Sequence, residues 1–179
     1  MNVAGIDTSL TGTGVVDREG LRFKLGTPAV GMDLYKRRAR LKGHARRIID
    51  HAIAGGVDLI VIEQPAYSKA QGHMHDRSGL WWLIVDELIE QGVPVIEVTP
   101  SSLKKFASGA GNCSKGDMRM ALYQRVGIDE KDDNKVDAWW LRAFGAALLG
   151  EPLVDLPKKN LEALAGYELP SRAAVIGAA

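Results

Sequence analysis

The sequence predicts an α/β domain in which helices flank both faces of a mixed five-stranded sheet. Two patterns predict it: apolar residues alternate with polar ones around glycine-containing turns near the start, and continuous apolar runs alternate with helical patterns further on. The first pattern is typical of an antiparallel meander and the second of parallel strands joined through helices. The 179 residues, 46% hydrophobic and 25% charged, suit one compact domain and exclude a disordered, collagen-like or coiled-coil chain.

Three strands are expected to form the meander. Residues 3–6 are a short apolar run, and Val15 and Val16 follow the glycine-rich stretch at 12–14. After a turn at 17–20, apolar and polar residues alternate from 21 to 25. Period-2 alternation around such a turn predicts an antiparallel hairpin.

Helices and buried strands then alternate. A helix is expected from about residue 33 to 54, with Asp33 as N-cap and Gly55-Gly56 as its stop. The apolar runs 57–62 and 93–98 predict strands buried on both faces. Helices are expected at 80–90, 117–126 and 135–149, with a loop and short helix after Pro100. Residues 1–150 thus form the expected domain, and the proline-bearing residues 151–179 a tail that packs on it or is partly mobile.

Acidic residues follow two of the expected strands and open the last helix. Asp7 comes directly after the first apolar run, Glu63 directly after 57–62, and Asp137 lies in the first turns of an apolar helix, with Asp133 and Asn134 on its face. Open sheets bind ligands at the carboxyl ends of their strands. Oxygen ligands from separate elements suit Mg²⁺, although each acid alone is also explained as a cap, a turn residue or a solvated charge.

Five short motifs in order resemble the RuvC family of Holliday junction resolvases, on the RNase H-like fold. They are Gly-Ile-Asp at 5–7 with Thr-Gly-Thr-Gly at 11–14, Ile-Glu-Gln at 62–64, Val-Thr-Pro-Ser-Ser-Leu-Lys at 98–104, Gly-Ala-Gly-Asn-Cys-Ser-Lys at 109–115, and Asn-Lys-Val-Asp-Ala at 134–138. Order and spacing agree over residues 1–149, and the match is closest to divergent forms found in phages and related bacteria.

The resemblance implies a homodimer that binds a four-way DNA junction and makes one nick per subunit, in recombination, repair or phage DNA processing. It implies two Mg²⁺ or Mn²⁺ ions per active site, with Asp7, Glu63 and Asp137 as ligands. The family usually has an acid or histidine where this chain has Asn134. The fourth ligand is therefore either Asn134 or Asp133, and the charge of Asp133 favours it slightly.

Basic residues are candidates for DNA contact. Between residues 36 and 47 there are seven bases and no acid, which leaves 16 bases against 22 acids, a net −6, in the rest of the chain. Such a block is equally well explained as the solvated face of a helix. Lys104, Lys105 and Lys115 flank a glycine-rich loop, and the resemblance assigns Lys104 and Lys115 to the DNA backbone. Tyr67 is a candidate to stack on an unpaired base, or to pack under its loop. The seven bases are Lys36, Arg37, Arg38, Arg40, Lys42, Arg46 and Arg47.

Other features limit the classes of protein to consider. The chain has one cysteine, no apolar run near the roughly 20 residues of a membrane span, and no basic, apolar start typical of a signal peptide. A protein of the bacterial cytosol, or of the host cytosol if phage-encoded, is expected. Residues 109–116 do not complete a P-loop, so no nucleotide cofactor is expected. Of the adjacent Trp81 and Trp82, one is expected to face outward as a possible dimer contact, unless both lie in the core.

Two other functions fit part of the sequence. Residues 7–14 also resemble a phosphate-binding hairpin of sugar kinases and actin-like ATPases, but those proteins close two such domains around ATP. The other is a non-catalytic junction-binding scaffold whose metal site is impaired by Asn134.

Overall fold

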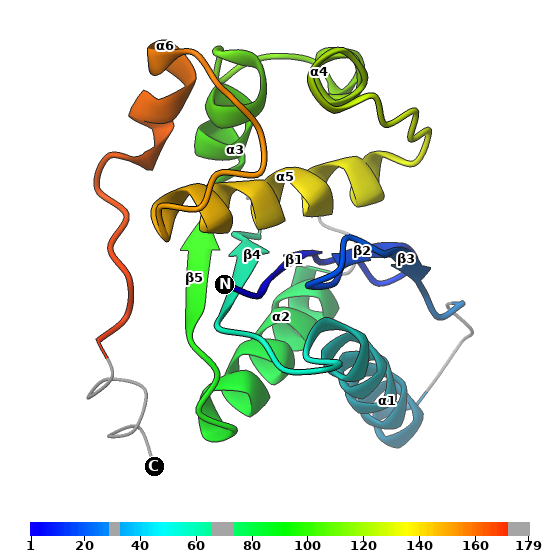
Figure 1. Ribbon diagram of the computed structural model, residues 1–179. Coiled ribbons are helices and arrows are strands. Elements are labelled where there is room, and N and C mark those ends of the chain that lie inside the picture. Colours follow the sequence, from blue (N-terminus) through cyan, green and yellow to red (C-terminus); the bar gives the residue numbers. More distant parts are fainter. Residues whose placement is uncertain (29–32, 66–73, 172–179) are drawn as a thin grey trace.

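A five-stranded sheet forms the centre of the protein in its computed structural model, which describes residues 1–28, 33–65 and 74–171 (Figure 1). The strand order is β3-β2-β1-β4-β5. Strands β1 (Val3–Asp7), β2 (Thr13–Val16) and β3 (Arg22–Leu25) form an antiparallel meander. Strands β4 (Leu59–Glu63) and β5 (Val95–Val98) run parallel to β1. The predicted mixed sheet is confirmed.

Helices cover both faces of this sheet, also as predicted (Figure 1). Helices α1 (Leu34–Ala52) and α2 (Met74–Glu90) pack on one face. Helices α3 (Pro100–Ser108), α4 (Lys115–Val126) and α5 (Asp133–Leu148) form the other layer, with α5 directly on the strands. Because side chains alternate along a strand, the sheet contributes to two separate cores: Ala4 and Ile6 enter the α1–α2 core, whereas Val3 enters the α5 core.

Several element boundaries differ from the sequence-based expectations. Helix α2 begins at residue 74 rather than 80, because its first turns are polar and carry no apolar periodicity. Helices α4 and α5 begin two residues early, where Ser114 and Asp132 accept hydrogen bonds from the first turn. Strand β5 lies at the sheet edge, so Glu97 is exposed and the strand is not buried on both faces.

The segment after α5 packs against α3. It contains the short helix α6 (Lys158–Leu161) and a 3₁₀ helix (Glu162–Leu164). The buried Asn160 donates from Nδ2 to the carbonyl oxygen of Phe106 at 2.7 Å. Leu156 and Ala163 are buried in the same core as α3. Within the described residues, none of the helices has the length and apolar character needed to cross a membrane.

Candidate active site at the carboxyl ends of two strands

The pairing of β1 with β4 brings Asp7 and Glu63 together. The two strands are parallel, with Gly5 opposite Val61 and Ile6 opposite Ile62. The next residues, Asp7 and Glu63, therefore end the strands side by side. Side chains alternate between the two faces, and Val3 and Val61 enter the α5 core, so both carboxyls lie on the α5 side of the sheet. Their side chains share a hydrogen bond.

Two glycines let α5 approach the sheet closely enough to bring Asp137 to this pair. A Cβ at Gly5 would lie 2.0 Å from the carbonyl oxygen of Ala138, and a Cβ at Gly14 would lie 1.9 Å from that of Asn134. Both separations are far below van der Waals contact, so any side chain there would displace the helix. Backbone contact between α5 and strands β1 and β2 thus sets the position of Asp137.

The three carboxyls resist ionisation as a group. Burial, and then the charges of Glu63 and Asp137, raise the pKa of Asp7 well above its ordinary value. Burial and the charge of Asp137 raise the pKa of Glu63 to about 7. The pKa of Asp137 is raised to about 6, mainly by burial, against the opposing effect of Lys115. Acids held in this state gain most from a cation placed among them.

Lysines from two helices lie near the carboxyls. The charges of Lys104 on α3 and Lys115 on α4 both lower the pKa values of Glu63 and Asp137. Lys115 Nζ also lies 3.6 Å from Asp133 Oδ2. Both lysines were candidates from the sequence, and the fold brings both within electrostatic range of the acids.

The two candidates for a fourth ligand have different surroundings. The charge of Asp133 raises the pKa of Asp137. Its Oδ1 is buried and forms an ion pair with Arg119 Nε at 2.8 Å. The amide nitrogen of Asn134 instead lies against Gly12, where a Cβ would be 3.0 Å away. Asp133 already pairs with the cationic side chains of Arg119 and Lys115, so its carboxylate suits a metal cation better than the neutral amide of Asn134 does.

The donor set fits a hard divalent cation, but the side chains do not form a ready site. Among residues 1–28, 33–65 and 74–171, no three His, Cys, Asp or Glu side chains are arranged to hold a metal ion. Asp7 and Glu63 interact directly with each other, and the pKa values of both are raised. Metal binding would require these carboxyls to be ionised.

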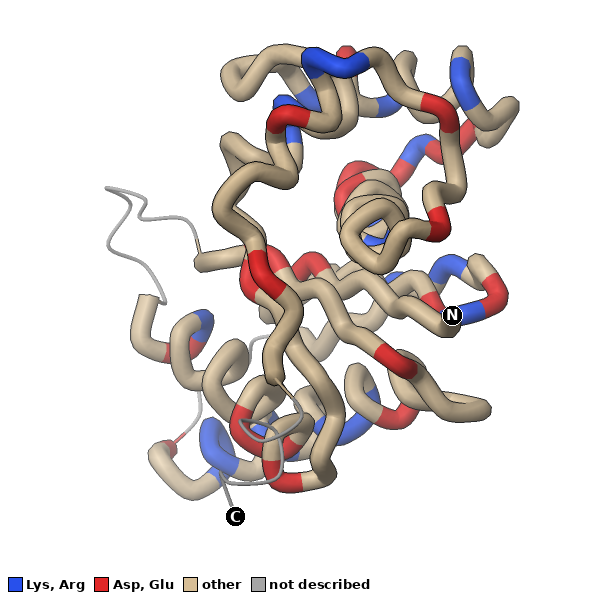
Figure 2. The backbone as a smooth tube through the Cα atoms, turned by 60° about the vertical axis from the view of Figure 1, so that its left-hand side comes forward, with Lys and Arg blue, Asp and Glu red and all other residues tan. Residues whose placement is uncertain are grey.

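The other predicted DNA contacts lie elsewhere. Lys105 pairs with Glu162 at 3.1 Å, on the side of the tail. The bases of α1 belong to the opposite face of the sheet, in the lower part of Figure 2. There Arg37 pairs with Asp76 at 2.5 Å, Arg40 donates to the Thr27 carbonyl oxygen at 2.7 Å, and Arg38 is exposed. Tyr67 lies outside the described residues.

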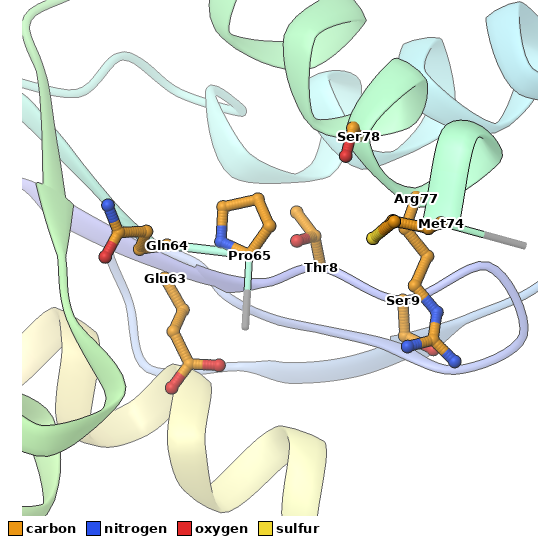
Figure 3. Close-up of a pocket in the computed structure, with 8 residues that line it drawn as sticks. All are labelled: Thr8, Ser9, Glu63, Gln64, Pro65, Met74, Arg77 and Ser78. Carbon is orange, nitrogen blue, oxygen red and sulfur yellow. The ribbon is translucent and has the colours of Figure 1, made fainter. Parts of the chain in front are cut away.

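Two arginines in this region were not predicted from the sequence. Arg119 lies one helical turn after Lys115, on a helix with weak apolar periodicity. Arg77 lies in the polar first turns of α2, which were not expected to be helical. It lines a cavity of about 290 Å³ next to Glu63 (Figure 3). Only the capping and turn propensities of residues 74–79 could have extended that helix.

Comparison with known proteins identifies the fold. The sequence matches no protein-family model and no curated protein. Among solved structures, Thermus thermophilus RuvC is similar, with a TM-score of 0.62 and 20% identity over 87% of this chain and 100% of that one. T. thermophilus RuvC in complex with Holliday junction substrate is also similar, with a TM-score of 0.59 and 18% identity over 87% of this chain and 99% of that one. At such identities the likeness is one of fold, and the protein has a RuvC-like RNase H fold.

Proposed function

We propose that the protein is a metal-dependent, structure-selective endonuclease that resolves four-way DNA junctions by paired nicks. The observation that carries the proposal is the meeting of Asp7, Glu63 and Asp137 from β1, β4 and α5, with their pKa values raised, on a RuvC-like fold. A junction substrate is favoured because a similar solved structure is of RuvC in complex with one. Mg²⁺ or Mn²⁺, two ions per site, is the proposed cofactor.

The acids and the two nearby lysines each have a role in this proposal. Asp7, Glu63, Asp137 and, in preference to Asn134, Asp133 would hold the ions, which when bound supply an activated water and charge stabilisation for the leaving oxygen. Lys104 and Lys115 would hold the scissile phosphate, since ammonium groups beside the acids attract an anion that the acids alone would repel.

Other contacts with DNA and with a second subunit belong to the same proposal. Arg38 on α1 is exposed, and Arg37 and Arg40 are available to DNA only if they leave their present partners. Lys105 and Tyr67 remain candidate DNA contacts. For the homodimer, Trp82 on α2 is 62% exposed while its neighbour Trp81 is buried, so Trp82 is a candidate interface residue.

The test is nicking of a labelled four-way junction by wild type and by Asp7→Asn, with Mg²⁺ or with EDTA. We expect Mg²⁺-dependent nicks in both strands of like polarity for wild type, and at least a roughly 100-fold slower rate for Asp7→Asn with junction binding retained. Mg²⁺ should also raise the melting temperature of wild type more than that of Asp7→Asn, because a ligand of the folded state stabilises it.

The matched control is Asp86→Asn, which makes the same change at an exposed position of α2. It should nick and respond to Mg²⁺ as wild type does. Junction binding without any nicking by wild type would instead support the non-catalytic scaffold. Undiminished nicking by Asp7→Asn would refute the assignment of the acids.

A further inference from the structure

We propose that the cavity on the α2 side of Glu63 binds a second phosphodiester of the nicked strand, with the Arg77 guanidinium as its charged partner. The inference rests on the proposed function for the identity of the ligand as DNA. It adds a binding site on the other side of the acids from Lys104 and Lys115.

The cavity is open at the same strand ends that carry the acids. Its volume is about 290 Å³. The residues that line it come from three places: the turn after β1, the end of β4 and the first turns of α2 (Figure 3). They are Thr8, Ser9, Glu63, Gln64, Pro65, Met74, Arg77 and Ser78.

The lining has the chemistry of a phosphate site. Thr8, Ser9 and Ser78 supply hydroxyls to the cavity, and Arg77 supplies a guanidinium (Figure 3). Arginine presents several donors in a planar fork that matches phosphate oxygens. The one acid in the lining, Glu63, extends its carboxyl toward α5 and away from Arg77 (Figure 3).

Arg77 has no acidic partner among the residues that the structure describes. Its neighbour Asp76 is buried and paired with Arg37, so the nearest acid in sequence is already engaged. Within the described parts of the chain, Arg77 has no ion-pair partner within 4.0 Å. An exposed guanidinium in a cavity that hydroxyl side chains also line is suited to binding a phosphate.

The positions of Lys104 and Lys115 on one side and of Arg77 on the other suggest a path for the DNA strand. Lys104 and Lys115 act on the acids from the α3–α4 layer, whereas Arg77 comes from α2, which packs on the other face of the sheet. A DNA strand whose scissile phosphate lies at the acids would therefore run across the carboxyl ends of β1 and β4. Its neighbouring phosphate would then enter the cavity next to Arg77.

The experiment measures junction binding in EDTA, in the Asp7→Asn background, with and without Arg77→Ala. The probes are four-way junctions in which one phosphate near the crossover is replaced by an uncharged methylphosphonate. We expect Arg77→Ala to weaken binding about tenfold and to reduce the slope of log affinity against log salt by about one. One methylphosphonate position should weaken binding of the parent, yet have no further effect on Arg77→Ala.

Arg77→Lys and Arg125→Ala are the comparison variants. Arg77→Lys keeps the charge, so it should restore the salt slope but not the full affinity. Arg125→Ala removes an exposed arginine at the far end of α4 and should leave the methylphosphonate pattern unchanged. If each methylphosphonate costs Arg77→Ala as much as it costs the parent, the phosphate site is wrong. Absence of nicking by wild type, measured separately, would refute the nuclease while leaving this coupling intact.

Discussion

At the scale of one residue, Glu63 makes the stability of the metal-free protein depend on pH. Its side chain is half-buried beside Asp7 and Asp137, and its pKa is raised from 4.5 to about 7. The folded state therefore binds more protons than the unfolded chain between these two pH values. Asp137, with its pKa raised to about 6, acts in the same direction. Without metal, the contribution of these two carboxyls to the free energy of unfolding is therefore greatest below this window and is lost as pH rises through about 7.

Glu63→Gln should remove much of this pH dependence. Glutamine keeps the shape of the side chain but does not ionise. The variant therefore loses no stability at position 63 as pH rises. Between about pH 5 and about pH 8, we expect the variant to lose on the order of 2 kcal/mol less stability than wild type, since one pKa unit corresponds to about 1.4 kcal/mol. Urea unfolding in EDTA at both pH values measures the difference. Asp86→Asn should follow wild type, and a Glu63→Gln profile parallel to wild type would show that Glu63 is not held at a raised pKa.

At the scale of elements, the site depends on how closely α5 lies on the meander. The Cβ of Gly14→Ala would stand 1.9 Å from the backbone of Asn134, and backbone cannot move aside as a side chain can. We expect this variant to lose about 3 kcal/mol of unfolding free energy and to nick far more slowly, because α5 carries Asp137 away from Asp7. Chemical denaturation and the junction assay check the two effects.

Gly43→Ala is the control for that substitution. Gly43 lies within α1, and a Cβ there would meet nothing within 4 Å. Alanine in a helix interior should raise the unfolding free energy by about 0.5–1 kcal/mol, with nicking unchanged. If both alanine variants had similar stability, the close packing of α5 on β2 would be wrong.

The sequence predicted elements wherever apolar periodicity was strong, and missed what depends on caps or on contacts between distant segments. Strands β1 and β4 are visible as apolar runs, so the amino-acid order alone places Asp7 and Glu63 at strand ends. The predicted helix begins six residues later than α2 does, because the first turns of α2 are polar. Arg77 lies in those turns, so it was not among the predicted site residues. The contact of Gly14 with Asn134 joins residues 120 positions apart, and no local pattern encodes it.

At the scale of the whole molecule, charge is divided between regions rather than balanced locally. The net charge is only +1, yet the acids of β1, β4 and α5 lie together at the carboxyl ends of the central strands, and seven bases lie on α1. Lys104, Lys115 and Arg77 come to these strand ends from two different layers. The field at the acids is therefore set by tertiary structure, and the composition alone gives no sign of it.

Within the described residues, Asp7, Glu63 and Asp137 form the one group of three carboxyls with raised pKa values. Paired nicks in our proposal therefore require two chains. We predict that a dimer with one wild-type and one Asp7→Asn subunit makes a single nick. Two tags allow this mixed dimer to be purified and then assayed on a supercoiled plasmid that extrudes a cruciform. Wild type should yield linear plasmid, because both strands are cut while the complex lasts, whereas the mixed dimer should yield nicked circles. A mixed dimer with Asp86→Asn should still yield linear plasmid. Linear product from the Asp7→Asn mixed dimer would mean that one site cuts both strands, and the two-subunit arrangement would be wrong.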